Sequence, residues 1–305
     1  MLDPHWPATP YVLWAALVGL VALLTVRAIR RDRTEYRRFK RLRLTAKRQA
    51  MMLRWLRDSV LTLGGSAVLL LALSWQFVGP LLTEIQSWFG LPLWLGWVIV
   101  LAVVVGLGVL TVVGILALRS SDDEVMMVGD IRAILPRNRQ EIRIGWWLSI
   151  NAGISEELLF RLAVPATLYG ASGNAIVAVV GSVVLFGALH LYQGVTGITA
   201  STLLGAAFFF AYVATGTILV PIVLHILVDL RSFVLLPIAA YGAHRIDGRT
   251  QPRISLTRVS PASLGDSVSP EVSVSPEVSV SPEVSVSPEV SSASRAGSAE
   301  SGGTL

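Results

Sequence analysis

The chain alternates long apolar runs with short polar segments, and the runs are about as long as a membrane is thick. An α-helix needs roughly 20 apolar residues to cross about 30 Å of hydrocarbon. Seven runs approach or reach this length, and each is predicted to form a membrane-spanning helix: residues 11–26, 59–78, 92–118, 145–168, 174–192, 196–214 and 217–240. We therefore expect an all-α, polytopic membrane helix bundle of about seven transmembrane helices.

Basic residues mark every second connection between these runs. Segments 27–58, 119–144 and 241–258 carry 13, 5 and 4 Lys or Arg residues, whereas segments 1–10, 79–91, 169–173 and 215–216 carry none. The short connection at about 193–195 falls on the basic side but carries no charge, so it does not test the pattern. Because basic loops stay in the cytoplasm, the pattern predicts a cell-membrane protein with its N-terminus outside and its C-terminus in the cytoplasm.

The basic segment 27–57 suggests lipid rather than nucleic acid as its partner. It lies directly between two apolar runs, where Lys and Arg fix topology and contact anionic lipid head groups. No aromatic stacking pattern or recognised nucleic-acid motif accompanies the charge, so we expect no nucleic-acid partner. We expect a cytoplasmic surface helix here, carrying Tyr36, Phe39, Leu42 and Leu44.

Composition supports the membrane reading and removes some chemistry. The 305 residues are 53% hydrophobic and only 15% charged, against about 25% charged in soluble domains. Because the chain has no cysteine, disulfides, thiolate metal sites and cysteine nucleophiles are excluded. Any metal would have to be held by His, Asp or Glu.

The C-terminal tail has a different character from the rest of the chain. The hexapeptide Ser-Val-Ser-Pro-Glu-Val occurs four times between residues 267 and 290. A proline every six residues opposes a helix, and no apolar face is large enough to fold upon. We expect disorder from about residue 250. The predicted organisation is an N-terminal membrane region 1–144, a core 145–240 and a cytoplasmic low-complexity tail 241–305.

Ionisable residues inside the last four apolar runs are the candidates for chemistry. A charge at the bilayer centre costs at least about 2.5–3.5 kcal/mol on insertion scales, so such residues default to a functional hypothesis. Glu157 and Arg161 are one helical turn apart and are predicted to pair. Glu156 points about 100° away from that pair and is a candidate general base.

Two histidines complete the set. His190 follows Phe186 by one turn, and His225 precedes Asp229 by one turn. Asp229 would either orient the imidazole of His225 or share a polar face with it. One glutamate and two histidines can activate a water directly, or through Zn²⁺ held by Glu156, His190 and His225. We expect these three side chains to face one cavity.

The three motifs resemble a known family. Glu156-Glu157-x-x-x-Arg161, Phe186-x-x-x-His190 and His225-x-x-x-Asp229 are similar to the signature of the CPBP family. This is the family of CAAX proteases and bacteriocin-processing proteins, also called Abi proteins or type II CAAX prenyl endopeptidases. The resemblance covers about residues 145–240.

This resemblance implies an intramembrane endopeptidase, glutamic or metal-dependent, that acts on membrane-associated and in some members prenylated CAAX proteins. Glu156 matches the base that activates water, while His190, His225 and Asp229 match residues that position water and stabilise the oxyanion. Glu157 and Arg161 match supporting residues. Two positions depart from the family: Asp229 stands where prenyl proteases typically have Asn, and Leu162 where many members have Gly.

Two other classes use similar residues. A transporter or proton-relay protein also needs acids and histidines within the membrane, and a peptide-binding immunity scaffold would keep the fold without cleaving. Glu157 and Arg161 could also be a purely structural buried ion pair. A histidine within the membrane, such as His190, could serve only in helix packing. Loss of cleavage on replacement of Glu156 distinguishes a protease from each of these.

Overall fold

Helices follow the apolar runs of the chain. The computed structural model describes residues 3–90, 92–120 and 133–248, which all lie within one compact unit, and no strand occurs among them. The longer helices are α1 (Thr9–Arg30), α3 (Thr45–Ser59), α4 (Gly65–Ser74), α5 (Val78–Phe89), α6 (Leu93–Ser120), α7 (Arg139–Glu157), α8 (Val164–Ser172), α9 (Ala175–Ala188), α10 (Gly194–Thr215) and α11 (Leu219–Leu230). Shorter α-helical pieces are α2 (Arg37–Lys40) and α12 (Leu236–Tyr241).

Together they form an all-α polytopic membrane bundle. In the described part of the chain, five helical stretches are long and apolar enough to cross a membrane: Thr9–Lys40, Thr45–Phe89, Trp94–Val113, Gly194–Thr215 and Leu219–Ala239. The two remaining predicted spans are also helical. One is the charged helix from α7 to α8, and the other is α9, which is apolar but has only 14 residues. The predicted tail lies outside the described residues from 249 onward, and the division at residue 144 stays a prediction.

The basic segment between the first two spans differs from the expected surface helix. The first helix runs on to Lys40, and α3 starts at Thr45, so the segment forms the tip of a helical hairpin. Tyr36 and Phe39 are buried there with Met52 and Trp55. The segment is therefore not a separate surface helix: its aromatic side chains pack on one another, while most of its Arg and Lys side chains stay exposed. Contact with lipid head groups stays a prediction.

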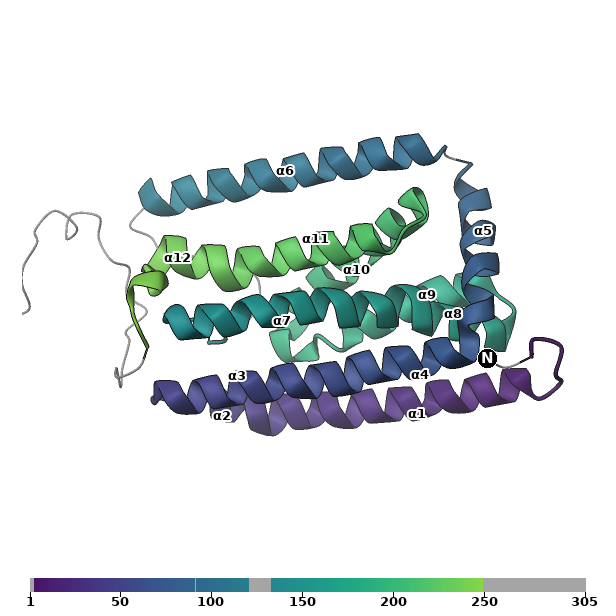
Figure 1. Ribbon diagram of the computed structural model, residues 1–305, viewed down its shortest axis with the longest axis horizontal. Helices are drawn as coiled ribbons and strands as arrows, with labels where there is room; N and C mark the ends of the chain where they lie inside the picture. Colours follow the sequence, from purple (N-terminus) through teal and green to yellow (C-terminus); the bar gives the residue numbers. More distant parts are fainter. Residues whose placement is uncertain (1–2, 91, 121–132, 249–305) are drawn as a thin grey trace, which may run out of the picture. The chain divides into compact units, whose positions relative to one another are not determined.

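Helix α7 lies at the centre of the bundle, between α3–α4 and α11 (Figure 1). Gly145, Ser149 and Gly153 repeat every four residues on it, and such small residues let helices approach closely. A methyl group on Gly153 would collide with the side chain of Ile226 and approach the backbone of Ile222. Glycine at 153 therefore sets how closely α11 approaches α7.

The helix after Glu157 widens into a π-helical turn from Leu158 to Ala163 before α8 begins. Pro165, near the start of α8, has no N–H to donate to a carbonyl of the preceding turn. In a ladder of i to i+5 bonds, that carbonyl belongs to Phe160. Ser182 Oγ on α9 donates to the Phe160 carbonyl. Pro165 thus accounts for the irregular turn next to Glu157, and the hydroxyl of Ser182 satisfies the Phe160 carbonyl that the proline leaves without an N–H donor.

Helix α9 ends inside the bundle. Its 14 residues extend about 21 Å, which is less than the roughly 30 Å of the hydrocarbon layer. A short turn from Leu191 to Gln193 follows, and Gly194 adopts a positive φ of 77° as α10 begins. His190 therefore lies in a turn at the end of a short helix. This offset allows it to line the same hollows as Glu156.

Candidate active site

Glu157 is the centre of a buried polar chain. Its Oε2 lies 2.8 Å from Arg161 Nε, one turn along, as predicted for this pair. Its Oε1 accepts a hydrogen bond of 2.6 Å from His225 Nδ1. The side chains of Glu157 and Arg161 are 0% and 2% exposed, so water cannot take the place of either partner. Glu157 thus links the cation on its own helix to the imidazole on α11.

Glu157, and not Asp229, orients the imidazole of His225. Asp229 Oδ2 lies 3.9 Å from His225 Nε2, which is too far for a hydrogen bond. Because the carboxylate of Glu157 only accepts, Nδ1 carries the proton, and Nε2 is the nitrogen turned to the cavity. Of the two arrangements expected for His225 and Asp229, the structure has the shared polar face.

Glu156 lies on the open side of this chain. Its side chain is 19% exposed, and its Oε2 is 4.0 Å from His225 Nε2. At this distance the two groups do not hydrogen-bond directly, and a water can bridge such a separation. The adjacent glutamates therefore have different surroundings: Glu157 is sealed within the bundle, and Glu156 borders the cavity.

His190 is held by its own helix. Its Nδ1 donates to the carbonyl of Phe186 at 2.9 Å, which fixes the ring orientation and gives Nε2 the role of acceptor in the neutral imidazole. The ring centroids of His190 and Phe186 are 4.9 Å apart. Both histidines thus use Nδ1 for a protein acceptor.

Phe186 is the apolar wall behind these groups. It is 2% exposed, and its ring lies 4.5 Å from the Arg161 guanidinium carbon and 6.3 Å from the His225 ring. Gly205 on α10 makes room for it, because a methyl group there would collide with the Phe186 ring. The predicted supporting residues Arg161 and Phe186 therefore contact each other as well as the polar groups.

The candidate residues meet in one cavity of about 310 Å³. Glu156, His190, His225 and Asp229 line it together, as expected, and Glu157 lies behind it. The other polar residues that line the cavity were not singled out from the sequence: Ser59, Asn151, Gln193, Ser201 and Ser232. Nothing in their spacing sets them apart from ordinary polar residues at helix contacts.

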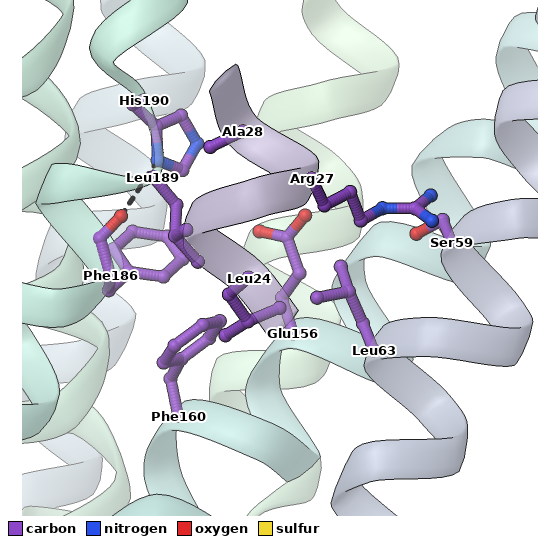
Figure 2. A pocket seen from close by; sticks show the side chains of 10 residues that line it. All are labelled: Leu24, Arg27, Ala28, Ser59, Leu63, Glu156, Phe160, Phe186, Leu189 and His190. Atoms are coloured by element: carbon purple, nitrogen blue, oxygen red, sulfur yellow. Dashed lines mark hydrogen bonds between the residues drawn. The ribbon is translucent and has the colours of Figure 1, made fainter. Parts of the chain in front are cut away.

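A second, smaller hollow of about 80 Å³ adjoins the first (Figure 2). Both hollows are lined by Ser59, Glu156, Phe186 and His190. The remaining residues of the smaller hollow come mostly from α1 and its neighbours: Leu24, Arg27, Ala28, Leu63, Phe160 and Leu189. The N-terminal spans, to which the sequence assigned no role, therefore form one side of the site.

Among residues 3–90, 92–120 and 133–248, no three His, Asp or Glu side chains are gathered into a group that could hold a metal ion. Nδ1 of each histidine donates to the protein, which leaves Nε2 as the nitrogen that could bind a metal. The zinc set of Glu156, His190 and His225 stays a prediction, and the chemistry below takes no step through a metal.

Comparison with known proteins agrees with the motifs. Residues 138–231 match the family model described as type II CAAX prenyl endopeptidase Rce1-like. This segment is Rce1-like. The resemblance inferred from the three motifs is thereby confirmed, and every candidate residue from Glu156 to Asp229 falls inside the Rce1-like segment. The match supports a membrane-embedded protease. No curated protein and no solved structure matches the chain.

Proposed function

We propose that the chain is an intramembrane endopeptidase in which Glu156 activates the attacking water. One observation carries this proposal: Glu156 borders the same cavity as His190 and His225, and lies 4.0 Å from an imidazole nitrogen that a second carboxylate fixes from behind. A water held between Glu156 and His225 Nε2 would be within reach of both. The Rce1-like match supports the same reaction class.

The reaction balances with these groups alone. Glu156 takes a proton from the water, and the resulting hydroxide attacks the carbonyl carbon of the scissile peptide bond. His190, whose Nδ1 donates to Phe186, accepts a hydrogen bond from the water at Nε2 and so positions it. His225, protonated on both nitrogens, directs its Nε2–H to the carbonyl oxygen as it becomes an oxyanion. Glu156 then returns the proton to the leaving nitrogen, and the C–N bond breaks. The products are a new carboxylic acid, which then loses its proton, and a new amine.

Asp229 has a different role from the Asn of the prenyl proteases. A carboxylate 3.9 Å from His225 Nε2 favours an imidazole that carries protons on both nitrogens, because the charges attract. Such an imidazolium donates a charge-assisted hydrogen bond to an oxyanion. In this proposal Asp229 therefore acts through His225, and does not itself contact the oxyanion.

The substrate follows from the family and the location of the site. We propose a membrane-associated protein of CAAX type, with a prenylated cysteine near its C-terminus, as the substrate class.

Replacement of the base tests the reaction class. Purified protein in liposomes is given fluorescent peptides ending in cysteine and three aliphatic residues, with and without a farnesyl group. We expect Glu156→Gln to lower kcat by about 10²–10⁴-fold while the peptides still bind. Glu84→Gln is the matched control, because Glu84 accepts from Tyr169 away from the site and Gln can also accept.

Three outcomes of this experiment are informative. Equal cleavage by Glu156→Gln and the unmodified protein would refute the proposal. Glu156-dependent proton flux without cleavage would indicate the transporter instead. A parallel assay with a chelator addresses the metal: unchanged cleavage supports the water mechanism above, and loss that added Zn²⁺ restores supports the metal set.

We further propose that the N-terminus lies outside and the basic hairpin lies in the cytoplasm, against anionic head groups. The chain contains no cysteine, so single cysteines report sidedness directly. His5→Cys should react with an impermeant maleimide added to intact cells, and Lys47→Cys only after lysis. The reverse labelling would overturn this orientation.

A further inference from the structure

Arg27 enters the active site from a part of the chain outside the Rce1-like segment. We propose that its guanidinium binds the C-terminal carboxylate of the peptide to be cleaved, so that a free C-terminus is a requirement for good substrates. This inference rests on the proposed protease function and specifies how that site selects its substrate. The family match begins at residue 138, and so says nothing about Arg27.

The position of Arg27 follows from the buried face of α1. Leu13, Leu17, Leu20 and Leu24 are buried at spacings of four, three and four residues, which is one face of an α-helix. The next position on this face is Arg27, three residues after Leu24. It is half-buried, whereas Arg30 is exposed. From the sequence alone, Arg27 was one of thirteen basic residues expected near lipid head groups, but its helical register turns it toward the bundle.

The surroundings of Arg27 favour an anionic ligand. Figure 2 shows its side chain extending to the neighbourhood of Ser59, and Arg27, Ser59 and Glu156 all line the smaller hollow. The other walls are largely apolar. A guanidinium presents a planar fork that matches a carboxylate with two hydrogen bonds, and such pairs strengthen where water is limited. The hydroxyl of Ser59 offers one more donor.

The size of the hollow indicates which part of the substrate occupies it. Glu156 and His190 line both hollows, so the scissile bond lies where the two meet. One side has about 310 Å³ and the other about 80 Å³. We assign the smaller side, which holds Arg27, to the end of the shorter product, the C-terminal piece with its terminal carboxylate. Without a cation, Glu156 would repel that group.

The contact between Arg27 and the substrate carboxylate is isolated by changing each partner in turn: Arg27 in the protein, and the C-terminal group in the peptide. The substrate is a fluorescent peptide ending in farnesylated cysteine and three aliphatic residues, prepared both as free acid and as C-terminal carboxamide. For the unmodified protein we expect kcat/KM to be roughly 10- to 100-fold higher for the acid. Arg27→Gln should lower cleavage of the acid to the level of the amide and leave the amide unchanged. Arg27→Lys should recover part of the preference.

Arg30→Gln is the matched control, since it removes the same charge one turn further along the same helix from an exposed position. It should leave the acid preference intact. Equal loss for acid and amide in Arg27→Gln would overturn the proposal, because Arg27 would then act on Glu156 or on the fold. Glu156-dependent cleavage with no acid preference in the unmodified protein would also overturn it, while leaving the protease function in place.

A binding measurement keeps the two proposals separate. In the Glu156→Gln background, the same acid and amide peptides are titrated without turnover. Tighter binding of the acid that Arg27→Gln abolishes supports the carboxylate contact, even if no cleavage is found in any variant. Identical binding of both peptides in this background rejects the contact on its own terms.

Discussion

Two buried arginine–glutamate pairs in this chain have opposite surroundings. Arg48 on α3 pairs with Glu141 at the start of α7, and Arg161 pairs with Glu157 near the middle of the same long helix. All four side chains are at most 2% exposed. The pairs therefore share composition and burial, and they differ in what surrounds them.

The Arg48 pair is saturated with hydrogen bonds. Arg48 donates to both carboxylate oxygens of Glu141, at 3.2 and 3.3 Å, and to the carbonyls of Ala133 and Leu135. Glu141 also accepts from the backbone of Arg137, whose side chain has a pKa lowered chiefly by its own burial and next by the nearby charge of Arg48. This pair joins the N-terminal hairpin to α7.

The Arg161 pair is not saturated. Neither Arg161 Nε nor Nη2 makes a hydrogen bond of regular geometry, although Nε lies 2.8 Å from Glu157. The guanidinium instead lies over the rings of Phe186 and Phe208, at 4.5 and 5.7 Å. The second oxygen of Glu157 holds His225. Arginine and glutamate thus hold two parts of the fold together at Arg48–Glu141, whereas at Arg161–Glu157 they support the histidine of the candidate site.

The largest effect is expected at the saturated pair. Glu141→Ala leaves Arg48 buried without its counter-charge, and should lower the free energy of unfolding by about 3–5 kcal/mol. Thermal unfolding in detergent measures the change. Cleavage per folded molecule should stay near normal at permissive temperature. A variant that unfolds normally but does not cleave would place Glu141 in the chemistry and break the comparison.

The second effect is on catalysis. Glu157→Gln keeps an acceptor for His225 Nδ1 but removes the charge that holds the imidazole and Arg161. We expect kcat to fall about 10- to 100-fold, as for other carboxylates that orient catalytic histidines. The loss of stability should be smaller than for Glu141→Ala, because the Phe186 and Phe208 rings still face the guanidinium. A larger stability loss with intact kcat would reverse the two roles.

The third change acts on helix spacing. Gly153→Ala places a methyl group against Ile226 on α11, and should cost about 1–3 kcal/mol through overpacking. Activity should fall too, because α11 carries His225 away from Glu157. Gly19→Ala on α1 is the control, since a methyl group there meets no atom within 4 Å. Equal behaviour of the two variants would contradict a spacing role for Gly153.

The smallest effect is expected at an exposed pair. Arg57 Nη2 lies 3.2 Å from Asp58, but the arginine side chain is 71% exposed. Arg57→Ala should change the free energy of unfolding by less than about 1 kcal/mol, and cleavage should not change. A loss comparable to that of Glu141→Ala would show that burial does not account for the difference between the pairs.

Much of the architecture could be predicted, because a bilayer permits few structures. A backbone in hydrocarbon must satisfy its own hydrogen bonds, so each apolar run had to be a helix. The hairpin around Phe39 and Trp55 escaped prediction since local composition does not show which aromatic residues will meet. The shortness of α9 was hidden as well: Leu191 and Tyr192 prolong the apolar run beyond the end of the helix.

The site was predicted in its residues more than in its contacts. Glu156, Glu157, His190 and His225 stood out because charged and titratable groups are rare in membrane helices. The bond between Glu157 and His225 joins residues 68 positions apart, and no spacing on either helix fixes their relative rotation. Arg27 was not predicted as a site residue because it is one of many basic residues in its segment, although its spacing from Leu24 places it on the buried face of the helix.

Helix α11 has a further property that follows from the contact of His225 with Glu157. His225 and Asp229 lie one turn apart on the same face, so sliding α11 by one turn, about 5.4 Å, would bring Asp229 to the present place of His225. Asp229 would then oppose Glu157, and two buried carboxylates would repel each other. Misassembled bundles with this slip are thus destabilised by the residues that form the site. The residues proposed for catalysis also select the correct alignment of the helices during folding.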